Sequence, residues 1–268
     1  MRGRRGRSNG CSRQARSRPV LELHRLTKHF GGVRAVDGVD LIVNPGEVLG
    51  LIGPNGSGKS TTVNLICGLF PLTSGLIMFK GEDISALPPH ERVTRGIART
   101  FQNIRLFGQL TVWQNLWVAQ NSAEQRRQNP VRRWFGGGGS AREDIGRTLE
   151  FFDLAHKRDE LAGNLAFGEQ RRLEFARAFA AKPVLLLLDE PAAGMNAEEI
   201  DQLDARIRTL RDTGMAILLI EHHVELVMSV ADRIAVLNFG QKIAEGSPAE
   251  VQNNPLVREA YLGTATAA

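Results

Sequence analysis

A glycine-rich stretch at residues 53–61 carries the clearest chemical pattern in this sequence. It reads Gly53-Pro54-Asn55-Gly56-Ser57-Gly58-Lys59-Ser60-Thr61 and satisfies the phosphate-binding pattern G-x-x-x-x-G-K-[ST]. The apolar residues 47–52 before it predict a strand, and residues 61–69 after it predict a helix. In that setting the glycines let backbone N–H groups wrap a phosphate chain, and the positive N-terminus of the helix points at the same place. The pattern therefore predicts a site for nucleotide phosphates.

The residues of this loop have separate predicted roles. Lys59 is expected to reach the terminal phosphates, and the Ser60 hydroxyl is suited to ligate Mg²⁺. The remaining predicted phosphate-binding residues are Gly53, Asn55, Gly56, Ser57, Gly58 and Thr61.

An acidic pair follows a second apolar run. Residues 184–188 lead straight into Asp189 and Glu190. An open α/β sheet binds its ligands at the carboxyl ends of its strands, which is where these acids would lie. We expect Asp189 to hold Mg²⁺ through water, and Glu190 to orient and polarise the attacking water. A pair of capping acids is the alternative interpretation, and the phosphate-binding loop favours the catalytic one.

Further motifs follow an order that resembles ATP-binding-cassette (ABC) ATPases. Residues 165–172, Leu-Ala-Phe-Gly-Glu-Gln-Arg-Arg, lie where that family has its Leu-Ser-Gly-Gly-Gln signature and a basic helix, shortly before Asp-Glu. The resemblance implies that Phe30 stacks on adenine and that His222 reaches the γ-phosphate. It also implies that Gln102 senses Mg²⁺ and contacts a membrane partner. Residues 194–196 occupy the position of the D-loop.

The signature segment is expected to serve the ATP of a partner chain, through Ala166, Gly168 and Glu169. A helix that starts near Gly168 would aim its N-terminus at that phosphate. Three residues depart from the family pattern. Ala166 stands where a serine would donate a hydroxyl, Glu169 replaces a glutamine, and Asn196 replaces the D-loop aspartate.

Within the ABC family the chain most resembles the larger ATP-binding subunit of branched-chain amino acid importers. The segments that carry this resemblance are residues 26–38, 99–107, 170–174 and 259–263. The resemblance implies ATP and Mg²⁺ as cofactors and a second ATP-binding subunit, identical or distinct. It also implies two transmembrane permease subunits, an indirectly coupled substrate-binding protein, and a peripheral location on the cytoplasmic face of the plasma (inner) membrane.

Other functions remain open at this point. A cassette of this kind serves equally well for urea, short amides or another small polar solute, because the transported molecule never touches the ATPase. A non-transport ABC ATPase of DNA repair or the ribosome would need coiled coils, zinc modules or a second cassette, which the sequence lacks. A P-loop kinase or GTPase would leave residues 165–172 and His222 unexplained.

The expected fold is α/β, that of a P-loop NTPase. Residues 184–188 and 216–220 are apolar throughout, which predicts strands of a mostly parallel sheet covered on both faces. The resemblance implies an N-terminal antiparallel β subdomain and an inserted α-helical subdomain at about residues 90–165, within one ABC ATPase domain at residues 20–268. Residues 129–140, with four consecutive glycines, predict a surface loop. Trp113, Leu116 and Trp117 recur at a spacing that predicts core packing.

The positive charge of the chain is concentrated at its start. The chain has 268 residues and a net charge of +5, yet residues 1–18 hold seven arginines and no acid. The rest then has 27 basic against 29 acidic residues, which argues against a nucleic-acid partner. We expect residues 1–19 to form a disordered basic tail. Two cysteines, Cys11 and Cys67, make no disulfide framework, and no apolar run approaches the length of a membrane span.

Overall fold

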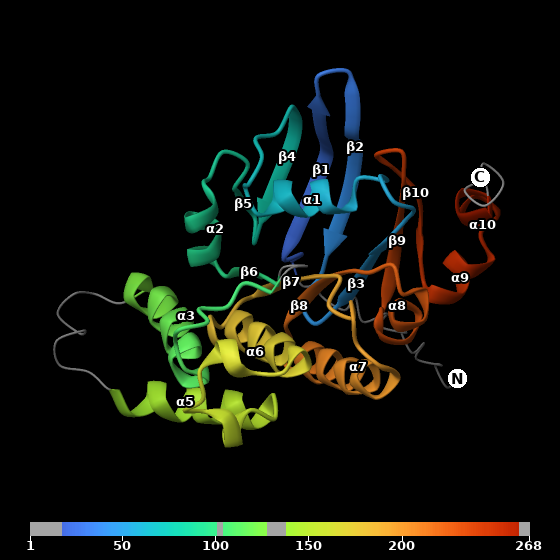
Figure 1. Cartoon of the computed structure of the whole chain (residues 1–268). Coiled ribbons are helices and arrows are strands. Elements are labelled where there is room, and N and C mark those ends of the chain that lie inside the picture. The colour runs from blue at the N-terminus through green and yellow to red at the C-terminus, as the bar shows by residue number, and fades with distance from the viewer. Residues whose placement is uncertain (1–17, 101–103, 128–137, 263–268) are drawn as a thin grey trace, which may run out of the picture.

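The computed structural model describes residues 18–100, 104–127 and 138–262, which form two β-sheets flanked by helices (Figure 1). Gln102 lies outside the described residues, as do residues 1–17 of the predicted tail and most of the predicted loop at 129–140. The larger sheet separates two hydrophobic clusters, and the smaller sheet contributes to one of them.

The larger sheet has six strands in the order β10-β9-β3-β8-β7-β6. All neighbours in it are parallel except β9 and β10. The strands are β3 (Val48–Ile52), β6 (Ile97–Arg99), β7 (Leu185–Asp189), β8 (Ala216–Ile220), β9 (Arg233–Asn238) and β10 (Gln241–Gly246). This is the mostly parallel sheet predicted from the apolar runs.

Both faces of the central strands are buried, which explains why their sequences are apolar throughout. Along β7, Leu186 and Leu188 belong to one hydrophobic cluster, whereas Leu185 and Leu187 belong to the other. Successive side chains of a strand point to opposite faces, so each face needs its own cover.

The smaller sheet has four antiparallel strands in the order β2-β1-β4-β5. Its strands are β1 (Leu21–Phe30), β2 (Val33–Val43), β4 (Ser74–Phe79) and β5 (Glu82–Asp83). The turn between β1 and β2 falls at the predicted Gly31-Gly32, and Gly31 takes a φ of 57° there. These strands match the expected N-terminal antiparallel region.

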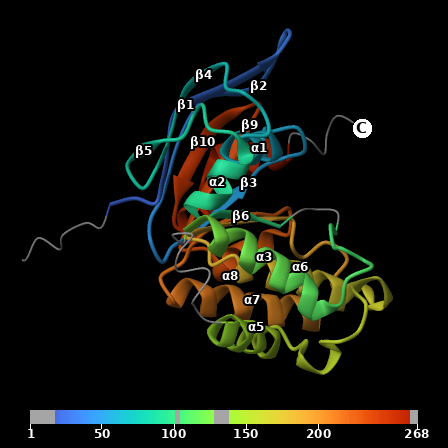
Figure 2. The same ribbon diagram turned by 90° about the vertical axis from the view of Figure 1, so that its left-hand side faces the viewer.

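Helices cover the larger sheet on both sides. Helix α1 (Lys59–Ile66) contributes Val63, Leu65 and Ile66 to the cluster that both sheets share, and Figures 1 and 2 show it between them. The opposite face carries α6 (Phe167–Ala180), α7 (Ala197–Asp212) and α8 (Val224–Val230). Helix α1, which follows the phosphate-binding loop, and helix α6, which carries the signature segment, therefore pack on opposite faces of the larger sheet.

The remaining helices lie at the ends of the sheet. Figure 2 shows α3 (Val112–Arg127) and α5 (Gly138–Phe151) beside α6, on the side away from the antiparallel strands. The short helices are α2 (Pro89–Arg95), α9 (Pro248–Asn253) and α10 (Pro255–Leu262), with 3-10 turns at Ala155–Lys157 and Ala162–Asn164. No helix in the described ranges is both long and apolar enough to cross a membrane.

Four local expectations are corrected. Helix α1 begins at Lys59, two residues before the expected start, because Gly58 serves as its N-cap. Gly138 and Gly139, expected in a loop, lie in the first turn of α5. Trp117 is 44% exposed, so it is not the core residue that its spacing predicts. The proposed helical range of 90–165 also contains β6, which pairs with β7 in the sheet.

Candidate functional site

The phosphate-binding loop connects β3 to α1 and fits so closely that two of its residues must be glycine. A Cβ atom on Gly53 would lie 2.1 Å from the carbonyl oxygen of Leu237, and one on Gly58 would lie 2.4 Å from that of Ala35. Gly58 also takes a φ of 102°. The loop is thus fixed between β9 and β2, and its backbone enters α1 with the first N–H groups of the helix free of intrahelical partners.

Lys59 lies inside the curve of this loop. The residue is only 7% exposed, and its Nζ donates to the carbonyl oxygens of Gly53 at 2.7 Å and Pro54 at 3.0 Å. Burial lowers the pKa of Lys59, while the nearby charges of Glu190 and Asp189 act in the opposite direction. A buried ammonium held this way is suited to bind a phosphate oxygen.

The loop offers further groups that fit a polyphosphate. The hydroxyl oxygen of Ser57 is buried without a hydrogen-bond partner among the described residues. Ser60 is exposed in the first turn of α1, next to Lys59, and Asn55 and Gly56 are exposed at the tip of the loop. An orphaned buried hydroxyl, a buried cation and a helix N-terminus together suit a nucleotide phosphate with its Mg²⁺.

The acidic pair lies at the carboxyl end of β7, as the sequence predicts. Asp189 is 5% exposed, and its Oδ2 lies 2.6 Å from Nη2 of Arg99, the last residue of β6. Arg99 also donates from Nη1 to Oδ1 of Asn64 in α1 at 2.7 Å. The carboxylate that is expected to hold Mg²⁺ is therefore paired with a protein cation in this structure.

Glu190 and His222 follow neighbouring parallel strands and so meet at one edge of the sheet. The Nδ1 atom of His222 lies 3.9 Å from Oε2 of Glu190, and the His222 side chain is 56% exposed. Glu190 has a φ of 48°, a left-handed conformation that costs a non-glycine residue about 1–3 kcal/mol. Its N–H donates to the carbonyl oxygen of Ile220 at 2.8 Å. This arrangement is suited to bring a base, Glu190, and a polar side chain, His222, to the same phosphate group.

Phe30 ends β1 beside the hairpin turn and is 44% exposed. Its ring packs edge-on against Phe70 at 5.4 Å between centroids, with Nζ of Lys28 at 4.9 Å from its centroid. The exposed part of the ring offers an aromatic surface, and its role toward adenine stays a prediction. Gln102 lies outside the described residues, so its predicted role as a Mg²⁺ ligand also stays a prediction.

The signature segment forms the exposed start of α6. Ala166 is the N-cap of this helix and has no side-chain acceptor, whereas Oε2 of Glu169 accepts the Ala166 N–H at 3.0 Å. Gly168 lies against α7, since a Cβ there would be 2.4 Å from Oε1 of Glu199. Asn196 caps α7 by accepting the Glu199 N–H at 2.9 Å. An aspartate at this position could cap the helix in the same way.

Two residues at this edge were missed by sequence reasoning. Arg99 pairs with Asp189, and Glu221, which follows β8, is fully buried beside His222. The rule that pointed to Asp189, an acid at the carboxyl end of a buried strand, applies equally to Glu221 and would have found it. No such rule would have identified Arg99 from the sequence.

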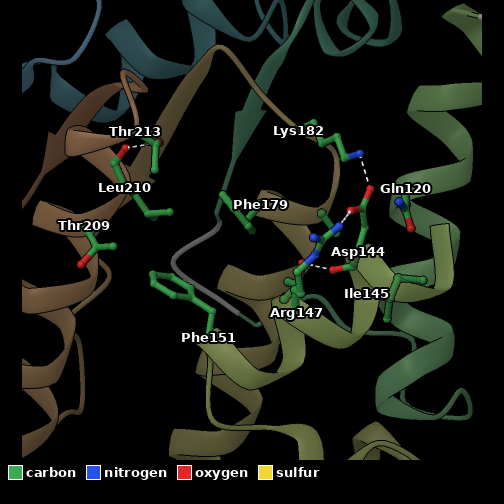
Figure 3. Close-up of a pocket in the computed structure, with 12 residues that line it drawn as sticks. Gln120, Asp144, Ile145, Arg147, Phe151, Phe179, Lys182, Thr209, Leu210 and Thr213 are labelled. Carbon is green, nitrogen blue, oxygen red and sulfur yellow. Dashed lines mark hydrogen bonds and ion pairs between the residues drawn. The ribbon is translucent and has the colours of Figure 1, made fainter. Parts of the chain in front are cut away.

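A separate cavity of about 360 Å³ lies between α3, α5, α6 and α7 (Figure 3). Its wall is largely apolar, with Ile145, Phe151, Phe179 and Leu210, and Figure 3 shows Asp144 between Lys182 and Arg147. Lys182 precedes β7, so the cavity lies near the amino end of that strand, whereas Asp189 is at its carboxyl end. The cavity is therefore distinct from the nucleotide edge.

Comparison with known proteins places this geometry in a family. A family model described as "ABC transporter" matches residues 36–193. A second, described as "Branched-chain amino acid ATP-binding cassette transporter", matches residues 241–267.

Curated relatives match over most of the chain. The high-affinity branched-chain amino acid transport ATP-binding protein BraF of Pseudomonas aeruginosa is 44% identical over 256 residues, covering 93% of this chain and all of the relative. The corresponding protein LivG of Escherichia coli is 41% identical, with the same coverage. The lipopolysaccharide export system ATP-binding protein LptB of Escherichia coli is 37% identical and covers 91% of this chain and 97% of the relative.

Solved structures agree with these relatives. An ATP-binding cassette of an ABC transporter in its ADP conformation superposes with a TM-score of 0.80 at 33% identity, covering 92% of this chain and all of that one. A nucleotide-free cassette gives a TM-score of 0.79 at 33% identity, with 91% and 99% covered. These likenesses confirm the predicted fold class and the family resemblance.

Proposed function

Since the chain belongs to the ATP-binding family of ABC transporters, we propose that it energises the import of branched-chain amino acids. It is an ATPase of this family, and its substrate is ATP. The proposal extends to the residues that act on ATP, the chains that assemble with this one, and the solute that is carried.

Residues at the carboxyl edge of the larger sheet, together with Phe30 at the end of β1, act on different parts of ATP. The backbone of residues 53–61 and the ammonium of Lys59 bind the phosphates, and Phe30 stacks on the adenine. Glu190 accepts a proton from the attacking water, and His222 contacts the γ-phosphate. When bound, Mg²⁺ neutralises charge on the phosphates, and Ser60, Asp189 and Gln102 would hold it.

The signature half of the chain serves a partner's ATP. Ala166, Gly168 and Glu169 lie at the exposed start of α6, on the opposite face of the sheet from α1. The chain pairs with a second ATP-binding subunit and with two permease subunits at the cytoplasmic face of the membrane, and a substrate-binding protein delivers the solute. Closure around ATP and opening on hydrolysis drive the permease.

The observation that carries the substrate assignment is the match at residues 241–267. The core motifs are common to all ABC ATPases, including the exporter subunit LptB at 37% identity, so they do not distinguish cargo. The C-terminal match and the identities of 44% and 41% favour branched-chain amino acids over urea, amides or an exported lipid.

Uptake in cells tests this assignment. Deleting the gene should abolish high-affinity uptake of labelled leucine, isoleucine and valine while leaving urea uptake unchanged. The unmodified chain should restore uptake, and the Glu190→Gln variant should not. Normal leucine uptake in the deletion strain, together with lost uptake of urea or an amide, would transfer the assignment to that solute.

A further inference from the structure

Glu221 is a buried acid at the carboxyl edge of the larger sheet, and the proposed function gives it no role. It follows β8 directly and is fully buried. Burying a charged carboxylate is unfavourable unless hydrogen bonds compensate for the lost water. Three backbone N–H groups supply that compensation here, and all of them belong to residues next to the candidate catalytic side chains.

The three hydrogen bonds reach two different segments. Oε1 of Glu221 accepts the N–H of Ala192 at 2.7 Å. Oε2 accepts the N–H groups of His222 at 3.1 Å and His223 at 3.2 Å. Ala192 is two residues after Glu190. A single carboxylate therefore joins the turn that carries Glu190 to the turn that carries His222.

Glu190 needs such support because its backbone is held in the left-handed region. A strained residue keeps that conformation only when the surrounding structure fixes it. Its own N–H is bound by the carbonyl oxygen of Ile220, and Ala192 is bound by the next residue, Glu221. Two consecutive residues of one chain segment therefore hold both sides of the Glu190 turn.

The carboxylate also borders the imidazole of His222. Nδ1 of His222 lies 3.7 Å from Oε2 of Glu221 and 3.9 Å from Oε2 of Glu190. The ring thus lies between two acids, one on each turn. None of the surface of Glu221 is exposed, so we expect it to act through its neighbours and not on the nucleotide itself.

We propose that Glu221 is a positioning residue that couples the Glu190 turn to the His222 turn, so that both side chains reach the γ-phosphate together. The proposal rests on the roles proposed above for Glu190 and His222. It assigns Glu221 an effect on the turnover of bound ATP and little effect on ATP binding.

Glu221→Gln is the main test, because the amide keeps the shape but places an N–H₂ group against a backbone donor. In the full chain we expect kcat to fall about 10- to 100-fold, since small displacements of a catalytic group have effects of this size. KM for ATP should change less than about threefold, because the phosphate-binding loop is untouched. In the Glu190→Gln background the added change should lower the residual rate by less than about threefold, since residues that act as a unit are not additive.

Hydrogen exchange supplies a readout that does not depend on hydrolysis. Losing one hydrogen bond should speed amide exchange about tenfold. Glutamine keeps one carbonyl oxygen that can still accept, so Glu221→Gln should speed exchange in the segment that faces its N–H₂ group, either 191–195 or 221–224. Glu221→Asp keeps the charge but is one methylene shorter. In this variant, amide exchange should speed up at residues 191–195 and stay slow at residues 221–224. If the glutamine variant does not fold, the aspartate variant tests the proposal in its place.

Glu47→Gln is the matched control. Glu47 is 7% exposed, accepts the N–H of Asn44 at 2.7 Å and precedes β3, at the opposite end of the sheet. It should lower stability without changing kcat or exchange at residues 191–195. Unchanged kcat in Glu221→Gln, losses that multiply with Glu190→Gln, or exchange in Glu221→Gln that rises in neither segment would overturn the coupling. Absent turnover in the unmodified chain would instead count against the ATPase assignment, and the exchange data would still decide the role of Glu221.

Discussion

Arg99 Nη2 lies 2.6 Å from Asp189 Oδ2, and both side chains are about nine-tenths buried. The pair joins β6 to β7 at the point where Mg²⁺ is expected beside the phosphates. Removing one partner of a buried ion pair costs about 3–5 kcal/mol, because the other charge is left uncompensated. A metal ion at Asp189 would replace that compensation, so we expect Arg99 and Mg²⁺ to be alternative partners of this carboxylate.

Arg99→Gln should therefore be less stable than the unmodified chain and regain more stability from ATP with Mg²⁺. We expect the rise in Tm on adding both to be larger in the variant, as measured by thermal unfolding with ATP alone and with ATP and Mg²⁺. The half-buried Arg95, which pairs with Glu91 on α2, provides the control Arg95→Gln. An equal rise in Tm for Arg99→Gln and the unmodified chain would show that the metal does not take the place of the guanidinium.

Lys59→Ala should abolish tight ATP binding. The ammonium is the one buried cation that contacts the carbonyl groups of the phosphate-binding loop in the described chain, and phosphate binding depends on such charge-assisted hydrogen bonds. Equilibrium titration with a fluorescent ATP analogue measures the loss. Lys157→Ala, which removes a lysine paired with Glu160 on the helical side, should bind like the unmodified chain. Equal affinities for both variants would remove Lys59 from the site.

The sequence predicted this edge of the sheet well because the relevant signals are local. Apolar runs that end in acids locate Asp189 and Glu190 at strand ends, and the glycine pattern locates the loop before Lys59. Parallel pairing of β7 and β8 then brings the residues that follow these strands together, including His222. The first step needs only local patterns, and the second adds the pairing of two apolar runs that the sequence already predicts as parallel strands.

The parts that sequence reasoning missed depend on distant contacts or on local context. Arg99 lies on a three-residue strand and meets an acid 90 residues later, which no periodic pattern reports. The buried hydrogen bond from Ala192 to Glu221 likewise depends on how two turns pack. Gly138 and Gly139 join α5 although glycine lowers helix propensity, and Trp117 packs partly on Trp113 while staying 44% exposed.

Glu190→Gln should bind ATP normally and hydrolyse it at least about 100-fold more slowly, because an amide keeps the shape of the carboxylate but cannot accept the proton. Single-turnover hydrolysis of labelled ATP separates this step from binding. Glu225→Gln is the control, since Glu225 is an exposed acid on the first turn of α8, close to His222 in sequence. Turnover by Glu190→Gln at the rate of the control would show that another group orients the water.

Ala166→Ser tests the signature half of the chain and should act in two separable ways. Without nucleotide, the new hydroxyl can accept the Glu169 N–H and complete a capping box with the bond that Glu169 already makes to the Ala166 N–H. A serine N-cap contributes about 1 kcal/mol over alanine, so Tm should rise by about 2–4 °C in a chain of this size. This effect requires neither ATP nor a partner chain.

With ATP, the same hydroxyl can donate to a phosphate held by a partner's loop. A hydrogen bond to a charged group contributes about 1.5–3 kcal/mol, which corresponds to roughly ten- to hundredfold tighter association of the ATP-bound pair. Size-exclusion chromatography in the Glu190→Gln background, with and without ATP, should show more dimer for the doubly substituted chain only when ATP is present. Glu169→Gln should increase association further, since it removes a negative charge from the helix terminus that we propose to face the partner's phosphates. A rise in Tm without any ATP-dependent gain in dimer would limit the serine to helix capping and would show that the signature half works without a side-chain hydroxyl.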